Sequence, residues 1–267
     1  MVCAGLPSLS FGDLSQLLGQ LGEQLRRAGL DAGSRIAIAL PRGPEAALLS
    51  LAVCCVGTML PINPALAPNE LAEELRLSRP DALIVPGWAP IPAWVAESGQ
   101  AVGLFQVSAA IAALTDIALA QRTPVPRRAS DNKAPACSVC AIFRTSGTTG
   151  VAKRVPVTHE NLIEMGRKME RWLQLGPADR SACVMPIYYN AGFKATLVVP
   201  LLIGCSVALP RTAGPQDLPN WMMELKPTWL TAAPAFLQSV LDKLRTLPDG
   251  EPTHRLRFIL STASYLP

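Results

Sequence analysis

Residues 143–162, FRTSGTTGVAKRVPVTHENL, concentrate side chains that can bind a polyphosphate. Gly147 and Gly150 allow the backbone to turn tightly and to bring N–H groups close to a ligand. Hydroxyl donors and one positive charge are supplied by Thr145, Ser146, Thr148, Thr149 and Lys153. A Walker A loop is excluded, because Lys153 is followed by Arg154 and not by Ser or Thr. From these residues alone, a solvated turn between a strand and a helix remains the alternative.

The elements on either side of this loop are predicted from apolar periodicity. A strand pattern occupies residues 139–143, and an amphipathic helix is expected from a cap at Thr158 to about Gln174. The inner face of this helix is assigned to Leu162, Met165, Met169 and Trp172. Its basic side chains are assigned to solvent and not to a binding patch: Arg167, Lys168 and Arg171.

Helix and strand patterns alternate along most of the chain, which predicts an α/β fold with parallel sheets and helices on both faces. Expected helices cover residues 11–28, 44–57, 68–78 and 91–98. Expected strands cover residues 35–40, 58–62, 82–85, 102–107, 182–185, 205–209, 229–231 and 257–260. Residues 121–135 hold three prolines and five charged side chains, so we expect an exposed linker there.

The composition indicates a globular protein without a nucleic-acid surface. Of 267 residues, 49% are hydrophobic and 16% charged, which argues against disorder. The net charge of +4 is scattered and aromatic residues make up 5%, so neither a basic patch nor a base-stacking platform is expected. The apolar runs at residues 46–60 and 195–209 are too short to span a bilayer, and residues 1–10 lack a basic start. These features predict a cytoplasmic protein with no transmembrane segment.

Seven cysteines in mostly apolar surroundings predict free, buried thiols. Cys137 and Cys140 have the spacing of a zinc half-site or a redox motif. No second pair and no nearby histidine completes a metal site, so a structural role is favoured and no metal ligand is predicted.

The motif TSGTTGxxK followed by THxNL resembles the phosphate loop of the adenylate-forming enzymes. This superfamily includes acyl-CoA and aryl-CoA synthetases, the adenylation domains of peptide synthetases, and firefly luciferase. Other segments resemble the family in the same order along the chain: residues 9–40, 43–64, 68–85, 185–192, 226–237 and 257–267. The resemblance implies two packed, doubly wound sheets. It places residues 1–41 and 181–267 in one discontinuous subdomain and residues 42–180 in a second that carries the phosphate loop.

The resemblance also implies a two-step reaction. A carboxylate attacks ATP to give an acyl-adenylate and pyrophosphate, and a thiol of coenzyme A or of a carrier-protein phosphopantetheine then takes the acyl group. The residues matching the loop for the β- and γ-phosphates are Thr145, Ser146, Gly147, Thr148, Thr149, Gly150 and Lys153. Mg²⁺ would bridge these phosphates. Those matching the adenine segment are Ala263, Ser264 and Tyr265. Ala152 and Arg154 stand where the family often has Pro and Gly.

Residues 185–192 match the family segment that lines the pocket for the acid. Tyr189 stands where many relatives place a histidine, and Asn190 and Gly192 complete the predicted pocket residues. No carboxylate occurs between Met185 and Ala195, which disfavours a plain α-amino acid. For Asn190 two roles stay open: a hydrogen bond to a hydroxylated aryl acid, or a helix N-cap.

The family's chain normally continues for a few hundred residues that hold its magnesium glutamate, ribose aspartate and catalytic lysine. No residue here is therefore assigned a catalytic role. We expect the N-terminal, ATP-binding portion of an acid–thiol ligase, inactive alone and completed by a missing C-terminal domain. Two alternatives remain: a truncated, non-catalytic protein that binds a nucleotide or an acyl group, and an adenylation domain excised from a carrier-protein assembly line.

Overall fold

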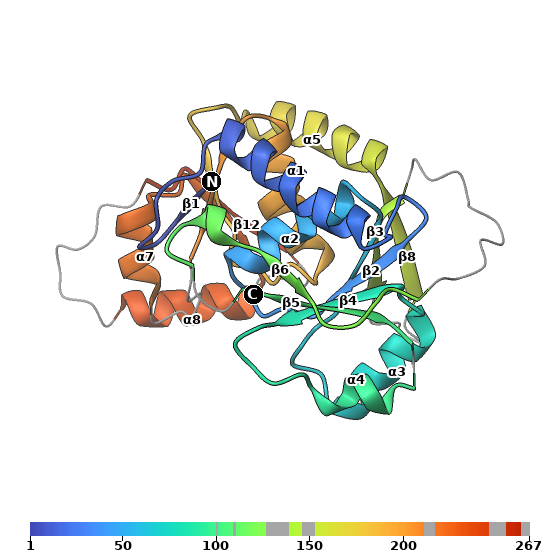
Figure 1. Ribbon diagram of the computed structural model, residues 1–267. Coiled ribbons are helices and arrows are strands. Elements are labelled where there is room, and N and C mark those ends of the chain that lie inside the picture. Colours follow the sequence, from blue (N-terminus) through green and yellow to red (C-terminus); the bar gives the residue numbers. More distant parts are fainter. Residues whose placement is uncertain are drawn as a thin grey trace. The chain divides into compact units, whose positions relative to one another are not determined.

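The computed structural model describes residues 1–99, 101–108, 111–126, 139–145, 153–210, 217–245 and 255–262, shown as ribbons in Figure 1. The chain divides into two compact units. The first contains Met1–Ser10, Arg42–Pro44 and Leu162–Pro267, and the second contains Phe11–Pro41 and Glu45–Asn161. Each unit is built on one sheet with helices, so the predicted α/β class is confirmed.

The second unit holds a seven-stranded sheet in the order β6-β5-β4-β2-β3-β7-β8. Its strands are β2 Arg35–Ile38, β3 Thr58–Pro61, β4 Ala82–Pro86, β5 Gly103–Val107, β6 Leu119–Gln121, β7 Val139–Thr145 and β8 Lys153–Thr158. The five inner strands are parallel, as predicted. Both edge strands are antiparallel to their neighbours, which the alternation of patterns did not predict.

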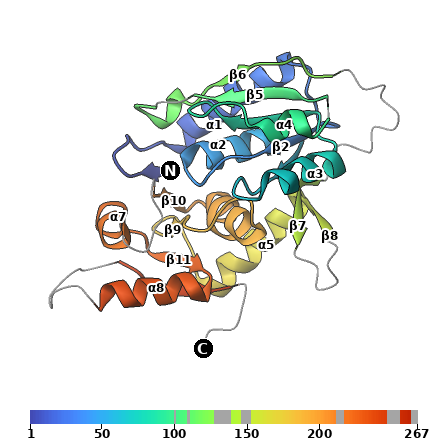
Figure 2. The same cartoon turned by 90° about the horizontal axis from the view of Figure 1, so that it is seen from below.

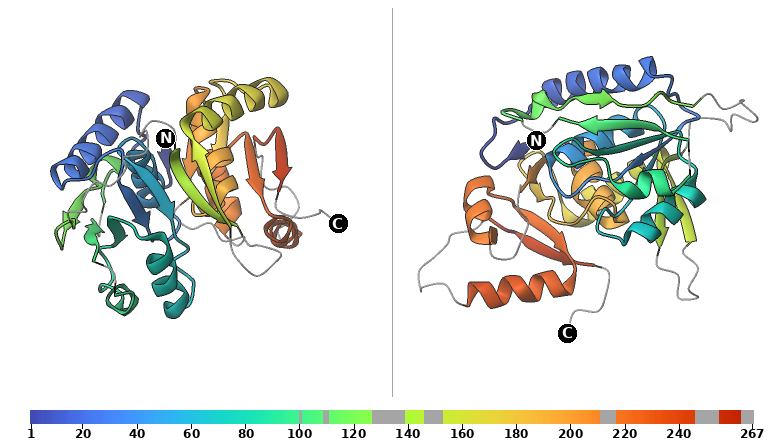
Figure 3. Two further views of the ribbon diagram at one scale, coloured as in Figure 1. Left: turned by 90° about the vertical axis from the view of Figure 1, so that its right-hand side faces the viewer. Right: turned by 60° about the horizontal axis from the view of Figure 1, so that its bottom comes forward.

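Helices cover both faces of this sheet, since α1 and α3 lie on opposite sides of it (Figures 1 and 3). The helices are α1 Phe11–Arg27, α2 Pro44–Cys54, α3 Pro68–Ser78 and α4 Ala93–Glu97, with a short 3₁₀ turn, η1, at Leu114–Asp116. The leucines of α1 that recur at helical spacing are buried: Leu14, Leu17, Leu21 and Leu25. Leu71 and Leu75 of α3 pack with Leu60 and Leu83 of the sheet.

The first unit holds a five-stranded, all-parallel sheet in the order β1-β10-β9-β11-β12. Its strands are β1 Val2–Cys3, β9 Arg180–Ala182, β10 Ser206–Leu209, β11 Trp229–Ala232 and β12 Phe258–Ser261. Its helices are α6 Val199–Leu202, α7 Leu218–Leu225 and α8 Pro234–Leu244, with the π-helix η2 at Gly192–Val198. Helix α5, His159–Leu173, begins in one unit and ends in the other. One apolar cluster joins α7 and α8 to this sheet, and Figure 2 shows these two helices close to β11.

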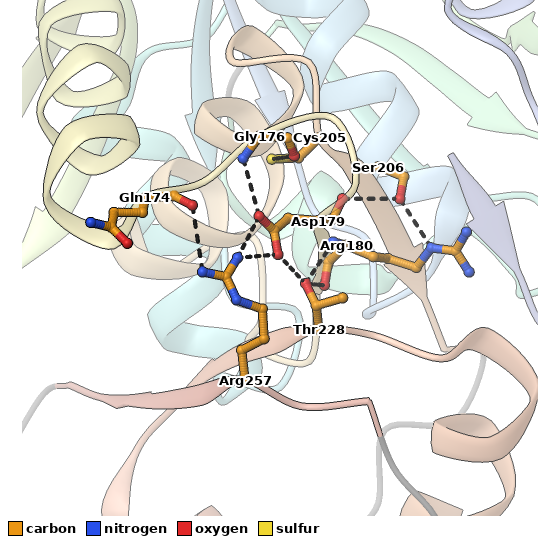
Figure 4. Close-up of polar contacts among 8 residues, drawn as sticks. All are labelled: Gln174, Gly176, Asp179, Arg180, Cys205, Ser206, Thr228 and Arg257. Atoms are coloured by element: carbon orange, nitrogen blue, oxygen red, sulfur yellow. Dashed lines mark hydrogen bonds and ion pairs between the residues drawn. The ribbon is translucent and has the colours of Figure 1, made fainter.

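A polar network fixes the starts of three strands of this sheet (Figure 4). Asp179, Thr228 and Arg257 are the residues directly before β9, β11 and β12. Nη1 of Arg257 donates to both carboxylate oxygens of Asp179 at 2.7 Å, and Thr228 Oγ1 donates to one of them at 2.8 Å. Burial acts to raise the pKa of Asp179, but hydrogen bonds from Arg257, Thr228 and the Gly176 backbone outweigh it, so that this pKa is lowered.

The boundary between the two sheets differs from the predicted one. Of residues 1–41, only the stretch up to Ser10 belongs with the five-stranded sheet, while α1 and β2 belong with the seven-stranded sheet. The reason lies in strand pairing, because β2 forms parallel ladders with both β3 and β4. Strands joined by a short helical crossover usually pair as neighbours, and α2 is such a crossover between β2 and β3.

Two smaller predictions are corrected. Trp172 does not lie on the inner face of α5, since it is 73% exposed, although Leu162 and Met169 are buried there as expected. Cys55 is exposed, whereas the other free cysteines of the described part of the chain are buried.

Most of the expected linker at residues 121–135 lies outside the described residues, and Gln121 ends β6. In the described part of the chain, no helix is long and apolar enough to cross a bilayer.

Candidate functional site

The predicted phosphate loop joins the two strands of an antiparallel hairpin. Strands β7 and β8 pair from Val139 opposite Thr158 to Thr145 opposite Lys153. The base of β7 is held in the core, since Ala141 and Phe143 are at most 1% exposed. Beyond Phe143 the strand emerges into solvent. Prediction from the sequence missed β8, because Lys153, Arg154 and Pro156 are poor strand formers.

Thr145 and Lys153 are brought together at the open end of this hairpin. They face each other in the register, and Thr145 Oγ1 lies 3.4 Å from the carbonyl oxygen of Lys153. Both residues are exposed. A hydroxyl and an ammonium group therefore stand where the loop leaves and re-enters the sheet, which suits an anionic ligand. The other predicted loop residues lie outside the described residues: Ser146, Gly147, Thr148, Thr149 and Gly150.

Buried thiols fasten the base of the hairpin to the sheet. Cys140 Sγ donates to the carbonyl oxygen of Val157 at 3.3 Å, and Cys54 Sγ of α2 donates to that of Cys140 at 3.3 Å. The hydrogen bond to Cys140 and burial raise the pKa of Cys54 well above its ordinary value. Cys140 thus has a structural role, while Cys137 lies outside the described residues. Among the described residues, no group of three or more His, Cys, Asp or Glu side chains could hold a metal ion.

The THxNL segment builds the start of α5. Asn161 donates its backbone N–H to Thr158 Oγ1 at 3.0 Å, and Thr158 donates its backbone N–H to Asn161 Oδ1 at 3.1 Å. This reciprocal pair satisfies backbone donors at the helix N-terminus and confirms the predicted cap. The segment therefore turns the chain from the end of β8 directly into α5.

Two predicted pocket residues, Tyr189 and Asn190, lie between β9 and η2 in the first unit, and the third, Gly192, is the first residue of η2. Tyr189 is 51% exposed, Asn190 is exposed, and the rings of Tyr188 and Tyr189 meet edge to face with centroids 4.8 Å apart. The N-cap position of η2 is Ala191, so Asn190 is not its capping residue. Both side chains are accessible to a ligand.

Gly192 has a steric reason to be glycine. A Cβ at this position would overlap the carbonyl oxygen of Pro186, so the close approach of the two segments requires a residue without a side chain. Thr196 supports the same turn, since its Oγ1 lies 2.7 Å from the carbonyl oxygen of Gly192 and 3.2 Å from Cys183 Sγ. Burial raises the pKa of Cys183 to about 11, which leaves it a neutral packing residue.

The remaining predicted residues, Ala263, Ser264 and Tyr265, lie outside the described residues. Beside the loop, Arg144 of β7 forms an ion pair at 3.3 Å with Glu74 of α3, and neither residue was predicted from the sequence. The signal for Arg144 was its position directly before Thr145, which mirrors that of Arg154 directly after Lys153. Nothing in the sequence pointed to Glu74, a helix residue far from the loop along the chain.

The chain belongs to the AMP-binding enzyme family, whose profile matches residues 2–267. It is 30% identical over 262 residues to the sulfoacetate–CoA ligase of Cupriavidus necator, an alignment covering 97% of this chain and 50% of the relative. It is 27% identical to the oxalate–CoA ligase of Arabidopsis thaliana, covering 98% of this chain and 52% of the relative. The chain thus spans about half the length of these curated relatives.

Solved structures support the same fold. ATP-bound MatB from Rhodopseudomonas palustris superposes with a TM-score of 0.75 over 99% of this chain and 51% of its own, at 24% identity. This likeness confirms the adenylate-forming fold that the sequence predicted for the residues described.

Proposed function

We propose that this chain is the part of an AMP-forming acid–thiol ligase that binds the phosphates of ATP. One observation carries the proposal: in a chain of the AMP-binding enzyme family, Thr145 and Lys153 face each other at the two ends of the phosphate loop. Both are exposed and present groups that bind phosphate oxygens. The donors of the loop between them would complete the site: Ser146, Gly147, Thr148, Thr149 and Gly150.

The proposed reaction requires Mg²⁺, which would bridge the phosphates and offset their charge. Among the described residues, no cluster of carboxylates is placed to hold the ion. The adenine ring would lie against Ala263, Ser264 and Tyr265. Coenzyme A is the proposed acceptor, because several relatives are named as CoA ligases. A carrier protein is the alternative, since tyrocidine synthase 3 also matches. We also propose a cytoplasmic location, where ATP and coenzyme A are both available.

We propose a small carboxylic acid as the substrate, bordered by Tyr189 and Asn190. Relatives named for sulfoacetate and oxalate act on small acids, and an exposed amide suits a polar acid better than a hydrocarbon chain. An acid-specificity profile of the intact protein, with Asn190→Ala beside it, tests this choice. Preference for long saturated acids, undisturbed by the mutation, would reject the pocket while leaving the phosphate site intact.

The test of the phosphate site is MgATP binding by the intact protein, measured calorimetrically. Lys153→Ala removes a charge-assisted hydrogen bond of about 1.5–3 kcal/mol and should weaken binding roughly tenfold to a hundredfold. Lys168→Ala removes the same charge from the exposed face of α5 and serves as the matched control. Equal affinity in both variants would show that the loop is not a phosphate site.

A second assay concerns this chain on its own. We propose that it does not adenylate acids, because its relatives are about twice as long. Acid-dependent exchange of pyrophosphate into ATP, with a panel of carboxylic acids, measures this directly. Robust exchange by the isolated chain would reject the proposal, and the intact protein under the same conditions is the positive control.

A further inference from the structure

Glu74, in the second turn of α3, contacts both strands of the hairpin that carries the phosphate loop. Its Oε2 lies 3.3 Å from Nη1 of Arg144 on β7, and its Oε1 lies 3.2 Å from Nη2 of Arg154 on β8. The Glu74 side chain is 13% exposed, whereas those of Arg144 and Arg154 are 47% and 34% exposed. One largely buried carboxylate thus joins two strands that are separate in sequence from its own helix.

The two arginines are directly opposite each other in the hairpin register. Like charges at such a cross-strand pair destabilise an antiparallel ladder. The carboxylate of Glu74 approaches both guanidinium groups and offsets their repulsion. Removal of Glu74 would therefore leave two uncompensated cations facing each other at the pair next to Thr145 and Lys153.

Arg154 also binds the backbone of α3. Its Nη1 donates to the carbonyl oxygen of Leu77 at 2.9 Å, in the last turn of the helix. Carbonyl groups there lack partners within the helix and carry the negative end of its dipole, so a guanidinium group is well placed. Helix α3 is itself held in the core by Leu71 and Leu75, which are at most 3% exposed.

The hairpin needs such an anchor, because β8 is the edge strand of its sheet and β7 is its neighbour there. Beyond the buried base at Phe143, the strands emerge into solvent. The contacts from α3 therefore act at the exposed half of the hairpin, one residue pair from the loop. Side chains alternate between the faces of a strand, so the side chains of Thr145 and Lys153 lie on the face opposite to those of Arg144 and Arg154.

We propose that Glu74 is a positioning residue for the phosphate loop. It clamps Arg144 and Arg154 against α3, and this keeps Thr145 and Lys153 in register at the two ends of the loop. The inference rests on the proposed phosphate-binding function. It also gives a role to Arg154, which stands where the family often has glycine: the arginine attaches the strand leaving the loop to a buried helix.

The experiment measures hydrogen–deuterium exchange and MgATP binding in the intact protein. The variants are Glu74→Gln, Arg154→Gln, the double variant and Lys153→Ala. Glu73→Gln is the matched control, because Glu73 lies next to Glu74 on α3 and pairs with Arg76 of the same exposed helix surface. Glu74→Gln should speed exchange of residues 153–158 without nucleotide and weaken MgATP binding, each by about fivefold. Glu73→Gln should match the wild type in both.

Coupling between the two clamp residues separates positioning from a general loss of stability. The double variant Glu74→Gln/Arg154→Gln should be no weaker in MgATP binding than the worse single variant, because both changes break one clamp. The Michaelis constant for the acid should stay unchanged in all of them. If Glu74→Gln fails to fold, Arg154→Gln carries the same test, since its exposed position tolerates a neutral side chain.

Each contrary result is distinguishable. Unchanged exchange and MgATP affinity in Glu74→Gln, while Lys153→Ala binds weakly, would overturn the role of Glu74 and leave the phosphate site standing. Weak binding by Arg154→Gln with unchanged exchange of residues 153–158 would also overturn it, since Arg154 would then bind phosphate directly. Wild-type MgATP affinity in Lys153→Ala would reject the phosphate site and, with it, the positioning role.

Discussion

Two carboxylate–arginine clusters, one in each unit, differ in the partners of their carboxylates. In the five-stranded unit, Asp179 accepts hydrogen bonds from Arg257, Thr228 and the Gly176 backbone, and its side chain is 6% exposed. In the seven-stranded unit, Glu74 meets two arginines and is 13% exposed. The first carboxylate is saturated by neutral and charged donors, whereas the second offsets two like charges.

The difference in position explains the difference in role. Asp179 joins the residues that start three parallel strands, at the end of the sheet opposite to that where ligands bind in parallel α/β sheets. Glu74 joins the two strands that carry the loop itself. We infer that the Asp179 cluster serves stability and that the Glu74 cluster serves orientation.

The largest expected effect is the loss of folding stability when the Asp179 carboxylate is removed. Asp179→Ala leaves Arg257 and Thr228 without their acceptor and should lower the free energy of unfolding by about 3 kcal/mol. Denaturant unfolding followed by tryptophan fluorescence measures this. Asp242→Ala is the control, because the ion pair between Asp242 of α8 and Arg245, directly after that helix, is exposed and should contribute under about 0.5 kcal/mol. Equal losses in the two variants would contradict the structural role of Asp179.

Gly192→Ala should destabilise the five-stranded unit by about 2 kcal/mol, because the added Cβ overlaps the Pro186 carbonyl and the backbone must shift. Gly19→Ala, at an exposed site of α1 where a Cβ meets no atom within 4 Å, is a control that should stabilise slightly. Melting temperatures of the two variants provide the comparison. A Gly192→Ala protein as stable as the wild type would mean that the start of η2 is not tightly packed against Pro186.

The contribution of Asp179 to folding stability should also depend on pH. Its pKa is lowered in the folded state, so its contribution is present above the unfolded pKa of about 3.9 and is lost as the pH falls through the lower, folded value. Asp179→Asn should therefore lose less stability than the wild type between about pH 5 and pH 2. Parallel curves for the two proteins would show that another group dominates acid unfolding.

The smallest effect on folding stability is expected when the charge of Glu74 is removed. Glu74→Gln should lower the free energy of unfolding by less than about 1 kcal/mol, because both arginines are partly exposed and remain hydrated. The same denaturant experiment compares this value with that of Asp179→Ala. A loss as large as that of Asp179→Ala would remove the contrast between the clusters.

Local elements were largely predictable, because they depend on spacing along the chain. The leucine period of α1 placed that helix, and helix α3 was predicted at residues 68–78 as observed. The Thr158 cap was predicted from residue type. Strand β8 was not, because its charged and proline residues oppose a strand, and pairing with β7 overrides their propensity.

The sequence by itself determined the α/β alternation and the family, since both depend on residue types and on local spacing along the chain. It also supplies the hydroxyl groups, glycines and ammonium group from Thr145 to Lys153 on which the proposed phosphate site depends. Tertiary structure decided which sheet receives β2, because ladders to β3 and β4 are formed between separate segments. It also decided the partners of the two carboxylates. Asp179 and Arg257 are 78 residues apart and Glu74 and Arg154 are 80 apart, so no local pattern could pair them. Such charges meet because the packing of helices and strands fixes their distance.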